Sequence, residues 1–198
     1  MQVPKDSGGA RRREILAIGT ELFAENGYHG TSIRDIAEAC DLQPASLYSH
    51  FQNKEEVLHG ILARYLQALI PALTAVADGD GDGRTRLAKM FDTAVRVGYA
   101  HRSQFLILSN DWNHIRRTPG LGVIVDQTRH CELIWMRVLK EGVGDGTLRA
   151  DVKLAQVQRV LFGAVAGMVD NRYDDLGGTP IRRGTKAATI LLDGLAVS

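Results

Sequence analysis

Two pairs of side chains in the middle of the chain have the types and spacing that acid–base chemistry requires. Asp111 precedes His114 by three residues, and Asp126 precedes His130 by four, so each carboxylate shares a helix face with an imidazole. Pairs at this spacing are commonly surface ion pairs. The sequence has no nucleophile elbow, phosphate-binding loop or H-E-x-x-H zinc signature beside them. The pattern therefore does not favour an enzyme.

The alternating Asp-Gly run over residues 78–83 is a second candidate for chemistry, because calcium loops are rich in Asp and Gly. A calcium loop needs a bidentate Glu at its twelfth position, and counted from Asp78 that position is Lys89. The glycines and like charges indicate an ordinary loop instead. We expect neither a bound metal nor another cofactor.

A third group of residues has the types that recognise DNA. Thr31 and Ser32 bring hydroxyls and backbone N–H groups to a predicted helix N-terminus, where a phosphate can bind, although plain N-capping explains them as well. Arg34, one turn further on, can reach a phosphate or a base edge, or can simply be a solvated surface arginine. Small and polar side chains that can approach the floor of a groove follow at Gln43, Ala45, Ser46, Ser49 and His50.

These residues depend on a set of short helices to position them. Apolar residues at helical spacing over residues 15–23 predict a first helix, which ends at the C-terminal signal Asn26-Gly27. Thr31-Ser32 can cap a second, short helix that ends at Cys40.

A third and a fourth helix follow directly. Pro44 occupies a position where a first-turn proline is tolerated, and Leu47 and Phe51 fall on the face that should pack on the first helix. Asn53, with Glu56 three residues later, resembles a capping box and opens a long fourth helix that reaches at least residue 70. The short link over residues 40–43 matches a helix-turn-helix, although short helix pairs are common in all-α proteins.

The rest of the chain continues the helical pattern. Further helices are predicted at residues 85–101, 103–117, 120–141, 152–176 and 184–196, and strand-type alternation with hairpin turns is absent from the sequence. We therefore predict an all-α fold of about nine helices, with an N-terminal three-helix domain and a larger helical domain behind it.

Composition limits the function without naming it. The chain has 198 residues, of which 44% are hydrophobic and 24% charged, which is typical of a soluble globular protein. We expect a cytoplasmic location, because no apolar run approaches the roughly 20 residues of a membrane span and the N-terminus lacks a signal-peptide core. Cys40 and Cys131 indicate neither a disulfide framework nor a metal cluster. The net charge of +1 gives no support for nucleic-acid binding, which must come from local pattern.

Three blocks of sequence supply that pattern. They are FAENGYHGTSIRDIA at residues 23–37, ASLYSHF at 45–51 and KEEVL at 54–58. In order and separation they closely resemble the DNA-binding domain of TetR-family repressors, and the resemblance covers about residues 11–62. It implies a homodimer with one N-terminal DNA-binding head per operator half-site and a pocket for a small-molecule inducer in each larger domain.

The resemblance also implies roles for individual residues. Tyr48 and His50 are similar to the family's phosphate-contacting pair, and Lys54 is similar to its lysine at the start of the fourth helix. Arg11, Arg12 and Arg13 are expected in a flexible arm, as phosphate or minor-groove contacts or as a solvated tail. The predicted DNA-binding residues are Thr31, Ser32, Arg34, Gln43, Pro44, Ala45, Ser46, Tyr48, Ser49, His50 and Lys54.

The ligand is less defined. Residues 126–151 look like the C-terminal domain of TetR relatives that sense acyl-CoA thioesters, which points to an acyl-CoA or another hydrophobic metabolite. Core packing is the more ordinary role for Trp135 and Met168, and a surface or internally satisfied position is the more ordinary one for His114. The predicted ligand-binding residues are Asn110, Trp112, His114, Trp135, Met168 and Arg172.

Dimerisation is assigned to residues 152–196. Gly163 and Gly167, at four-residue spacing, let two helices approach closely, and in TetR relatives the last two helices form the dimer interface. The predicted domains are an arm at 1–10, a helix-turn-helix domain at 11–55 and a ligand-binding and dimerisation domain at 56–198. A ligand-dependent activator of the same fold and a helical adaptor that binds no DNA are the alternatives.

Overall fold

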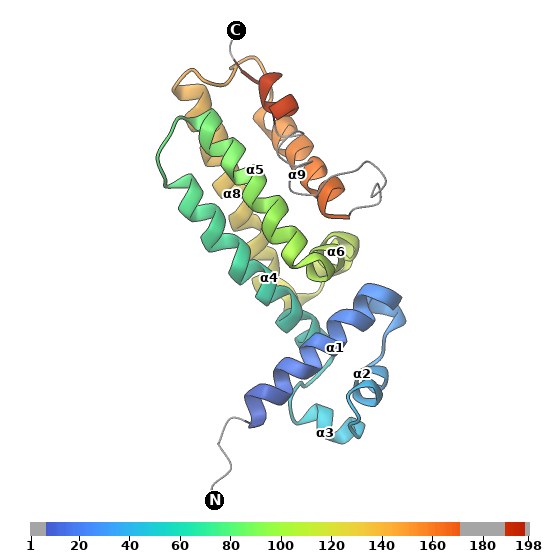
Figure 1. Ribbon diagram of the computed structural model, residues 1–198. Helices are drawn as coiled ribbons and strands as arrows, with labels where there is room; N and C mark the ends of the chain where they lie inside the picture. The colour runs from blue at the N-terminus through green and yellow to red at the C-terminus, as the bar shows by residue number, and fades with distance from the viewer. Residues whose placement is uncertain (1–6, 171–188, 197–198) are drawn as a thin grey trace, which may run out of the picture. The chain divides into compact units, whose positions relative to one another are not determined.

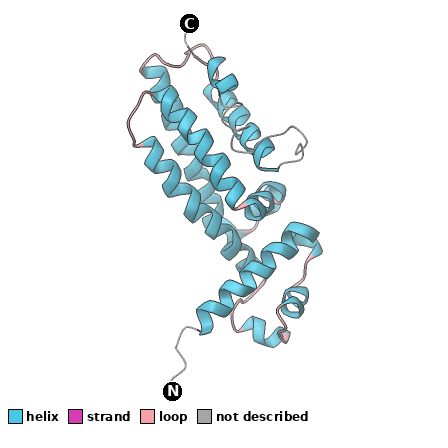
Figure 2. Ribbon diagram, viewed as in Figure 1, coloured by secondary structure: helices cyan, strands magenta, loops and turns pink. Residues whose placement is uncertain are grey.

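The computed structural model describes residues 7–170 and 189–196, and its regular structure is helical (Figure 2). Within these two ranges no β-strand is formed, and extended pairing is confined to a single bridge between Leu148 and Ala196. The predicted all-α fold is confirmed.

Figure 1 shows the helices in chain order. They are α1 (Ser7–Gly30), α2 (Ile33–Ala39), α3 (Pro44–Tyr48), α4 (Lys54–Ala77), α5 (Gly83–Ala100), α6 (Arg102–Asn110), α7 (Trp112–Ile115), the 3-10 helix η1 (Pro119–Leu121), α8 (Gly122–Gly144) and α9 (Leu154–Asp170). The helix predicted at 103–117 is therefore two helices, because the backbone leaves helical geometry at Asp111. Of the helix predicted at 184–196, residues 189–193 are helical and 184–188 lie outside the described residues.

The chain forms two compact units. One contains the residues up to Tyr65 together with Ser103–Val125, and the other contains Leu66–Arg102 together with the residues from Asp126 onward. Helix α4 contributes its first half to one unit and its second half to the other. The predicted boundary at residue 55 stays a prediction.

Helix α1 begins earlier than expected. Its first residue is Ser7, so residues 7–10, which were predicted to belong to a flexible arm, are helical, and residues 1–6 lie outside the described part. At the other end Gly27 has φ 74° and ψ 163°, which breaks the helix where the Asn26-Gly27 signal predicts. This left-handed φ favours glycine, since a Cβ would be strained there.

Helix α4 is long and largely apolar. By length and composition it could cross a membrane, but many of its large apolar side chains are buried inside this protein, among them Leu58, Ile61, Leu62 and Leu66. The helix starts as the sequence predicts, because the side-chain oxygen of Asn53 accepts a hydrogen bond from the Glu56 N–H at 2.8 Å. A buried core helix can have the same apolar composition as a membrane-spanning helix, so composition alone does not distinguish the two.

In the second unit α5 and α8 approach closely where two glycines meet. A Cβ added at Gly83 would lie 2.2 Å from the Cα of Gly142. The Asp145 carboxylate accepts the Gly83 N–H at 2.7 Å, which caps the N-terminus of α5 from outside the helix. Arg86 of α5 bridges to Glu141 of α8 at 2.7 Å. These contacts fix the packing of the two helices.

Candidate nucleic-acid interface

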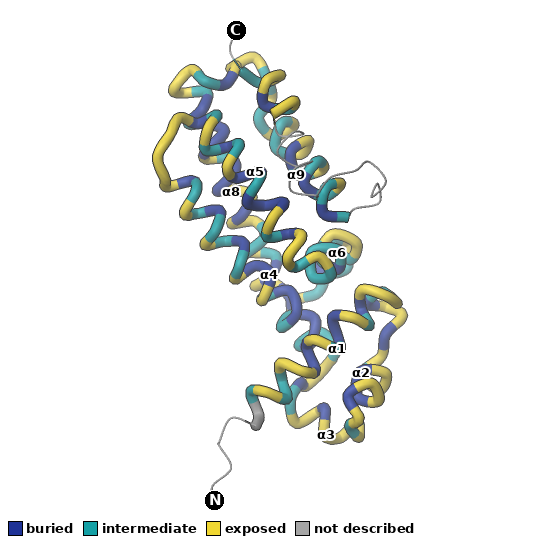
Figure 3. The backbone as a smooth tube through the Cα atoms, in the orientation of Figure 1, coloured by how far each residue is buried: buried dark blue, intermediate teal, exposed yellow. Residues whose placement is uncertain are grey.

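Helix α3 presents one polar face to solvent and buries the other. Leu47 has no exposed surface and Phe51, just beyond the helix, is 1% exposed. Tyr48 is 54% exposed, although it is a large aromatic residue. The exposed positions in α3 and directly beside it are Gln43, Ala45, Ser46, Tyr48 and Ser49. Figure 3 shows exposed positions in yellow around α3. The segment therefore has the exposure that a groove-reading helix requires.

The turn between α2 and α3 sets the position of α3. Asp41 adopts φ 52°, a left-handed conformation that Asp tolerates better than most residues. The Leu42 N–H then donates back to the Ala37 carbonyl at 2.8 Å, which closes the end of α2. Helices α2 and α3 pack on each other, and α2 packs on α1, so the predicted helix-turn-helix is present (Figure 1).

The N-terminus of α2 is closed by a capping box. The Ser32 hydroxyl accepts the Asp35 N–H at 3.2 Å, and the Asp35 carboxylate accepts the Ser32 N–H at 2.7 Å. The Ser32 N–H, and after it the Ser32 hydroxyl, lower the pKa of the Asp35 carboxyl group, which keeps its charge at neutral pH. An anionic carboxylate therefore lies where a phosphate was predicted. A contact from Ser32 to DNA stays a prediction.

Thr31 does not belong to the surface. It is 2% exposed, and its hydroxyl donates to the carbonyls of Leu22 at 3.2 Å and Gly27 at 3.1 Å. This hydroxyl is therefore engaged inside the protein, and the predicted contact of Thr31 to a phosphate stays a prediction. Its role is to tie the segment before α2 to the end of α1.

Other predicted DNA-binding residues remain at or near the surface. Arg34 is exposed on α2, and the Ser49 hydroxyl donates to the Ser46 carbonyl at 2.7 Å. Pro44 and His50 are half-buried at the two ends of the α3 segment. Their contacts to DNA stay predictions, and all five positions named here lie within the helix-turn-helix.

Lys54 is engaged inside the protein. Its ammonium group donates to the carbonyls of Tyr28 and Thr31, both at 2.8 Å, and lies 4.1 Å from the centre of the Tyr28 ring. It therefore neutralises the C-terminal end of α1. These contacts give Lys54 a structural role, and its predicted contact to phosphate stays a prediction.

The sequence predicted Arg11 and Arg12 in a flexible arm, but in the structure they lie elsewhere. Both belong to α1, where Arg11 donates to the Cys40 carbonyl at 2.6 Å and Arg12 donates to the His50 carbonyl. Their spacing could have indicated this, because Arg11 and Arg12 each precede a buried core residue, Ile15 or Leu16, by four positions. Arg13, the next residue of the helix, is exposed.

Three of the predicted ligand-binding residues fall in the same compact unit as the helix-turn-helix. Asn110 is exposed at the end of α6 and Trp112 is half-buried in α7. The His114 ring lies against Tyr28, with centroids 4.6 Å apart, and against His29 at 4.8 Å. Burial, followed by the neighbouring Glu55 carboxylate, raises the pKa of Tyr28, so its phenol stays neutral.

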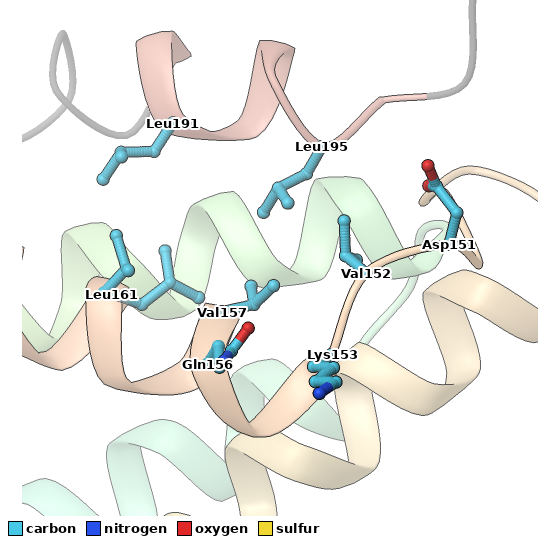
Figure 4. A pocket seen from close by; sticks show the side chains of 9 residues that line it. Asp151, Val152, Lys153, Gln156, Val157, Leu161, Leu191 and Leu195 are labelled. Carbon is cyan, nitrogen blue, oxygen red and sulfur yellow. The ribbon is translucent and has the colours of Figure 1, made fainter.

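The other predicted ligand-binding residues fall elsewhere. Trp135 is 2% exposed and packs edge-on against Phe162, Met168 is half-buried on α9, and Arg172 lies outside the described residues. The second unit has a cavity of about 470 Å³, mostly apolar, between α9 and residues 191–195. In Figure 4 the side chains of Leu191 and Leu195 point toward Val157 and Leu161 of α9. None of the predicted ligand residues lines this cavity.

Comparison with known proteins agrees with this arrangement. Residues 15–61 match the family model described as bacterial regulatory proteins of the tetR family. That range starts within α1 and ends within α4, so it spans the helix-turn-helix.

Full-length relatives extend the match into the second unit. The transcriptional repressor KstR2 of Rhodococcus jostii (strain RHA1) is 30% identical over 187 residues, which cover 94% of this chain and 91% of KstR2. The transcriptional regulator UidR of Escherichia coli (strain K12) is 39% identical over 169 residues, which cover 83% of each chain.

Solved structures share the fold. The ketosteroid transcriptional regulator KstR2 of Mycobacterium tuberculosis superposes with a TM-score of 0.85 at 27% identity, covering 100% of this chain and 98% of that one. AibR, solved with isovaleryl coenzyme A and operator DNA, has a TM-score of 0.79 at 20% identity over 92% of this chain and 98% of its own, which shows the fold alone. Through these full-length relatives and the matched DNA-binding region, the chain belongs to the TetR family of transcriptional regulators.

Proposed function

We propose that the protein is a transcriptional repressor that binds a palindromic operator as a homodimer and is released by a small-molecule inducer. The observation that carries the proposal is the exposed polar face of α3, opposite the buried Leu47. A helix of this kind places its side chains in the major groove, and a dimer presents two such helices to half-sites about 34–36 Å apart. The relatives named as repressors are consistent with this sign of regulation.

The dimer contact is proposed to use residues 152–196. On α9, Val160 is 55% exposed, and Gly163 and Gly167 are exposed with open space where a Cβ would be. Ile190, in the helical residues 189–193, is 65% exposed. Exposed apolar side chains next to glycines that permit close helix approach favour a second copy as the partner. Residues 171–188 lie outside the described part.

The inducer is proposed to be an acyl-CoA thioester or another hydrophobic metabolite that binds the larger, helical domain. AibR, which shares the fold, was solved with isovaleryl coenzyme A, and KstR2 is named a ketosteroid regulator. A ligand that binds the DNA-free conformation more tightly must weaken DNA binding, and by linkage DNA weakens ligand binding by the same factor. As a DNA-binding regulator of bacterial type, the protein is proposed to act in the cytoplasm.

A gel-shift titration against the DNA upstream of the protein's own gene tests DNA binding. We expect salt-sensitive binding that Tyr48→Ala weakens alike on all sequences, whereas Ser46→Ala or Gln43→Ala changes the sequence preference. Glu25→Gln, an exposed change near the end of α1, is the control and should leave binding unchanged. Absence of salt-sensitive binding to that DNA favours the helical adaptor that binds no DNA.

Release is tested by adding a panel of acyl-CoA thioesters and free hydrophobic acids to the formed complex. An inducer should dissociate the complex and raise the thermal midpoint of the DNA-free protein. A compound that instead strengthens DNA binding and increases expression from a reporter supports the ligand-dependent activator. Size measurement with Gly163→Leu beside wild type tests the dimer, since the larger side chain should leave a monomer.

A further inference from the structure

Each of the three helices of the DNA-binding head ends at a cation that comes from another helix. Lys54 of α4 donates to Tyr28 and Thr31 at the end of α1. Arg11 of α1 donates to Cys40, the C-cap of α2, and Arg12 of α1 donates to His50, one residue after the C-cap of α3. The pattern is a set of long-range contacts, since 29 residues separate Arg11 from Cys40 and 38 separate Arg12 from His50.

Helix C-termini favour such contacts for two reasons. The last carbonyls of a helix have no intrahelical donor, and the peptide dipoles place partial negative charge there. A guanidinium group supplies several N–H donors in a fixed plane, so one arginine can satisfy a carbonyl and bind a carboxylate at once. Two adjacent arginines on α1 therefore bind the C-terminal ends of the helix-turn-helix, Arg11 that of α2 and Arg12 that of α3.

Arg12 makes the larger set of contacts. Beyond its bond to the His50 carbonyl, its guanidinium carbon lies 3.9 Å from the centre of the Phe51 ring, and it donates to the Glu56 carboxylate at 2.9 Å. Glu56 also accepts the Gln52 N–H at 2.7 Å. The guanidinium thus joins α1 to the segment that connects α3 to α4 and to the first turn of α4.

We propose that Arg11 and Arg12 are positioning residues that fix the presentation of α3 to DNA and contact no phosphate themselves. This inference rests on the proposed DNA-binding function of α3. Arg11 is paired with Glu14 at 2.6 Å and Arg12 with Glu56, so each guanidinium has a carboxylate beside it that repels a phosphate. The head therefore uses two of its few basic residues to orient the recognition helix.

Salt dependence separates positioning from phosphate binding. Each neutralised phosphate adds about 0.9 to the magnitude of the slope of log affinity against log salt concentration. The proposed dimer has two heads, so a variant that loses one phosphate contact in each head has a slope lower in magnitude by about 1.8. Removal of a positioning side chain lowers operator affinity and leaves the slope unchanged. It also loosens α3 in the DNA-free protein, which hydrogen exchange of the amides of residues 47–51 reports.

The experiment compares Arg12→Gln with Arg13→Gln, which removes the same charge from the adjacent, exposed position. For Arg12→Gln we expect faster exchange at residues 47–51, unchanged exchange in α9, and operator affinity lower by about tenfold or more at an unchanged salt slope. Arg12→Lys, which keeps the charge, should recover part of the affinity because an ammonium can bond the carbonyl but cannot also match the planar contacts. Arg13→Gln should leave exchange at residues 47–51 as in wild type.

Two results would overturn the proposal. A salt slope lowered by about 1.8 with unchanged exchange in Arg12→Gln would assign the residue to phosphate binding, and unchanged operator affinity would show that it orients nothing. If Arg12→Gln does not fold, Arg12→Lys tests the positioning role through exchange at residues 47–51 and operator affinity, and wild-type values of both would overturn the proposal. Should the wild-type protein bind no operator, the proposed function fails, while exchange in the DNA-free protein still tests whether Arg12 holds α3.

Discussion

Replacing Lys54 by methionine separates two roles for a residue at the centre of the head. Methionine keeps the length and apolar stem of lysine and removes its charge and its donors. In the structure the ammonium group makes two hydrogen bonds of 2.8 Å, to the carbonyls of Tyr28 and Thr31, and lies 4.1 Å from the Tyr28 ring centre. The variant can make none of these three interactions.

The size of the effect follows from those interactions. A hydrogen bond to a charged group contributes about 1.5–3 kcal/mol and a cation–π contact about 0.5–2 kcal/mol. Because Lys54 is half-exposed, the lower values apply, and the two hydrogen bonds and the cation–π contact together give a decrease in stability of about 3.5 kcal/mol. For a chain of this size each kcal/mol lowers the melting temperature by about 2–4 °C, so we expect a decrease of about 7–14 °C.

Thermal unfolding followed by circular dichroism measures this change, with Lys140→Met as the control, since Lys140 is exposed on α8. Salt titrations of DNA binding at 15 °C, where the variant is still folded, provide the second measurement. A melting temperature within about 2 °C of wild type, combined with a salt slope lower by about 1.8, would refute the structural role and assign Lys54 to phosphate.

Three further changes test single contacts. Thr31→Val removes the buried hydroxyl bonds to Leu22 and Gly27 and should lower the free energy of unfolding, measured by urea titration, by about 1–3 kcal/mol. Ser32→Ala changes an exposed residue and should lower it less. A larger effect of Ser32→Ala than of Thr31→Val would contradict the burial of Thr31. Gly83→Ala places a Cβ 2.2 Å from the Gly142 Cα and should lower the free energy of unfolding by about 1–3 kcal/mol. Gly122→Ala adds a Cβ in open space and should leave stability unchanged or raise it. Equal stability of the two variants would mean that α5 and α8 do not approach as described. The Gln52 N–H, and after it Arg12, lower the pKa of Glu56, so its contribution to stability is complete above the unfolded value of about 4.3 and is lost as pH falls through the lower folded value. Between pH 6 and pH 3 the stability difference between wild type and Glu56→Gln should therefore shrink, and a difference that stays constant would remove Glu56 from this linkage.

Local sequence patterns predicted most helix ends of the head, although not the start of α1 at Ser7. The break in α1 at Gly27, the cap at Ser32, the first-turn Pro44 and the cap at Asn53 each depend on residues within one turn of one another. The buried Leu47 and exposed Tyr48 follow from helical periodicity in the same way. Such features need no knowledge of the partner helices, because their hydrogen bonds and their periodicity lie within a few residues of chain.

Tertiary packing decided which polar side chains face solvent. Thr31 and Ser32 are adjacent and equally able to cap a helix, yet one is buried and the other exposed. Arg12 and Lys54 are basic residues of the kind that bind DNA, but their hydrogen-bond partners lie between 23 and 44 residues away in the chain. A charge with several donors binds whichever carbonyl or carboxylate the fold places beside it, so its role depends on the packing of the other helices.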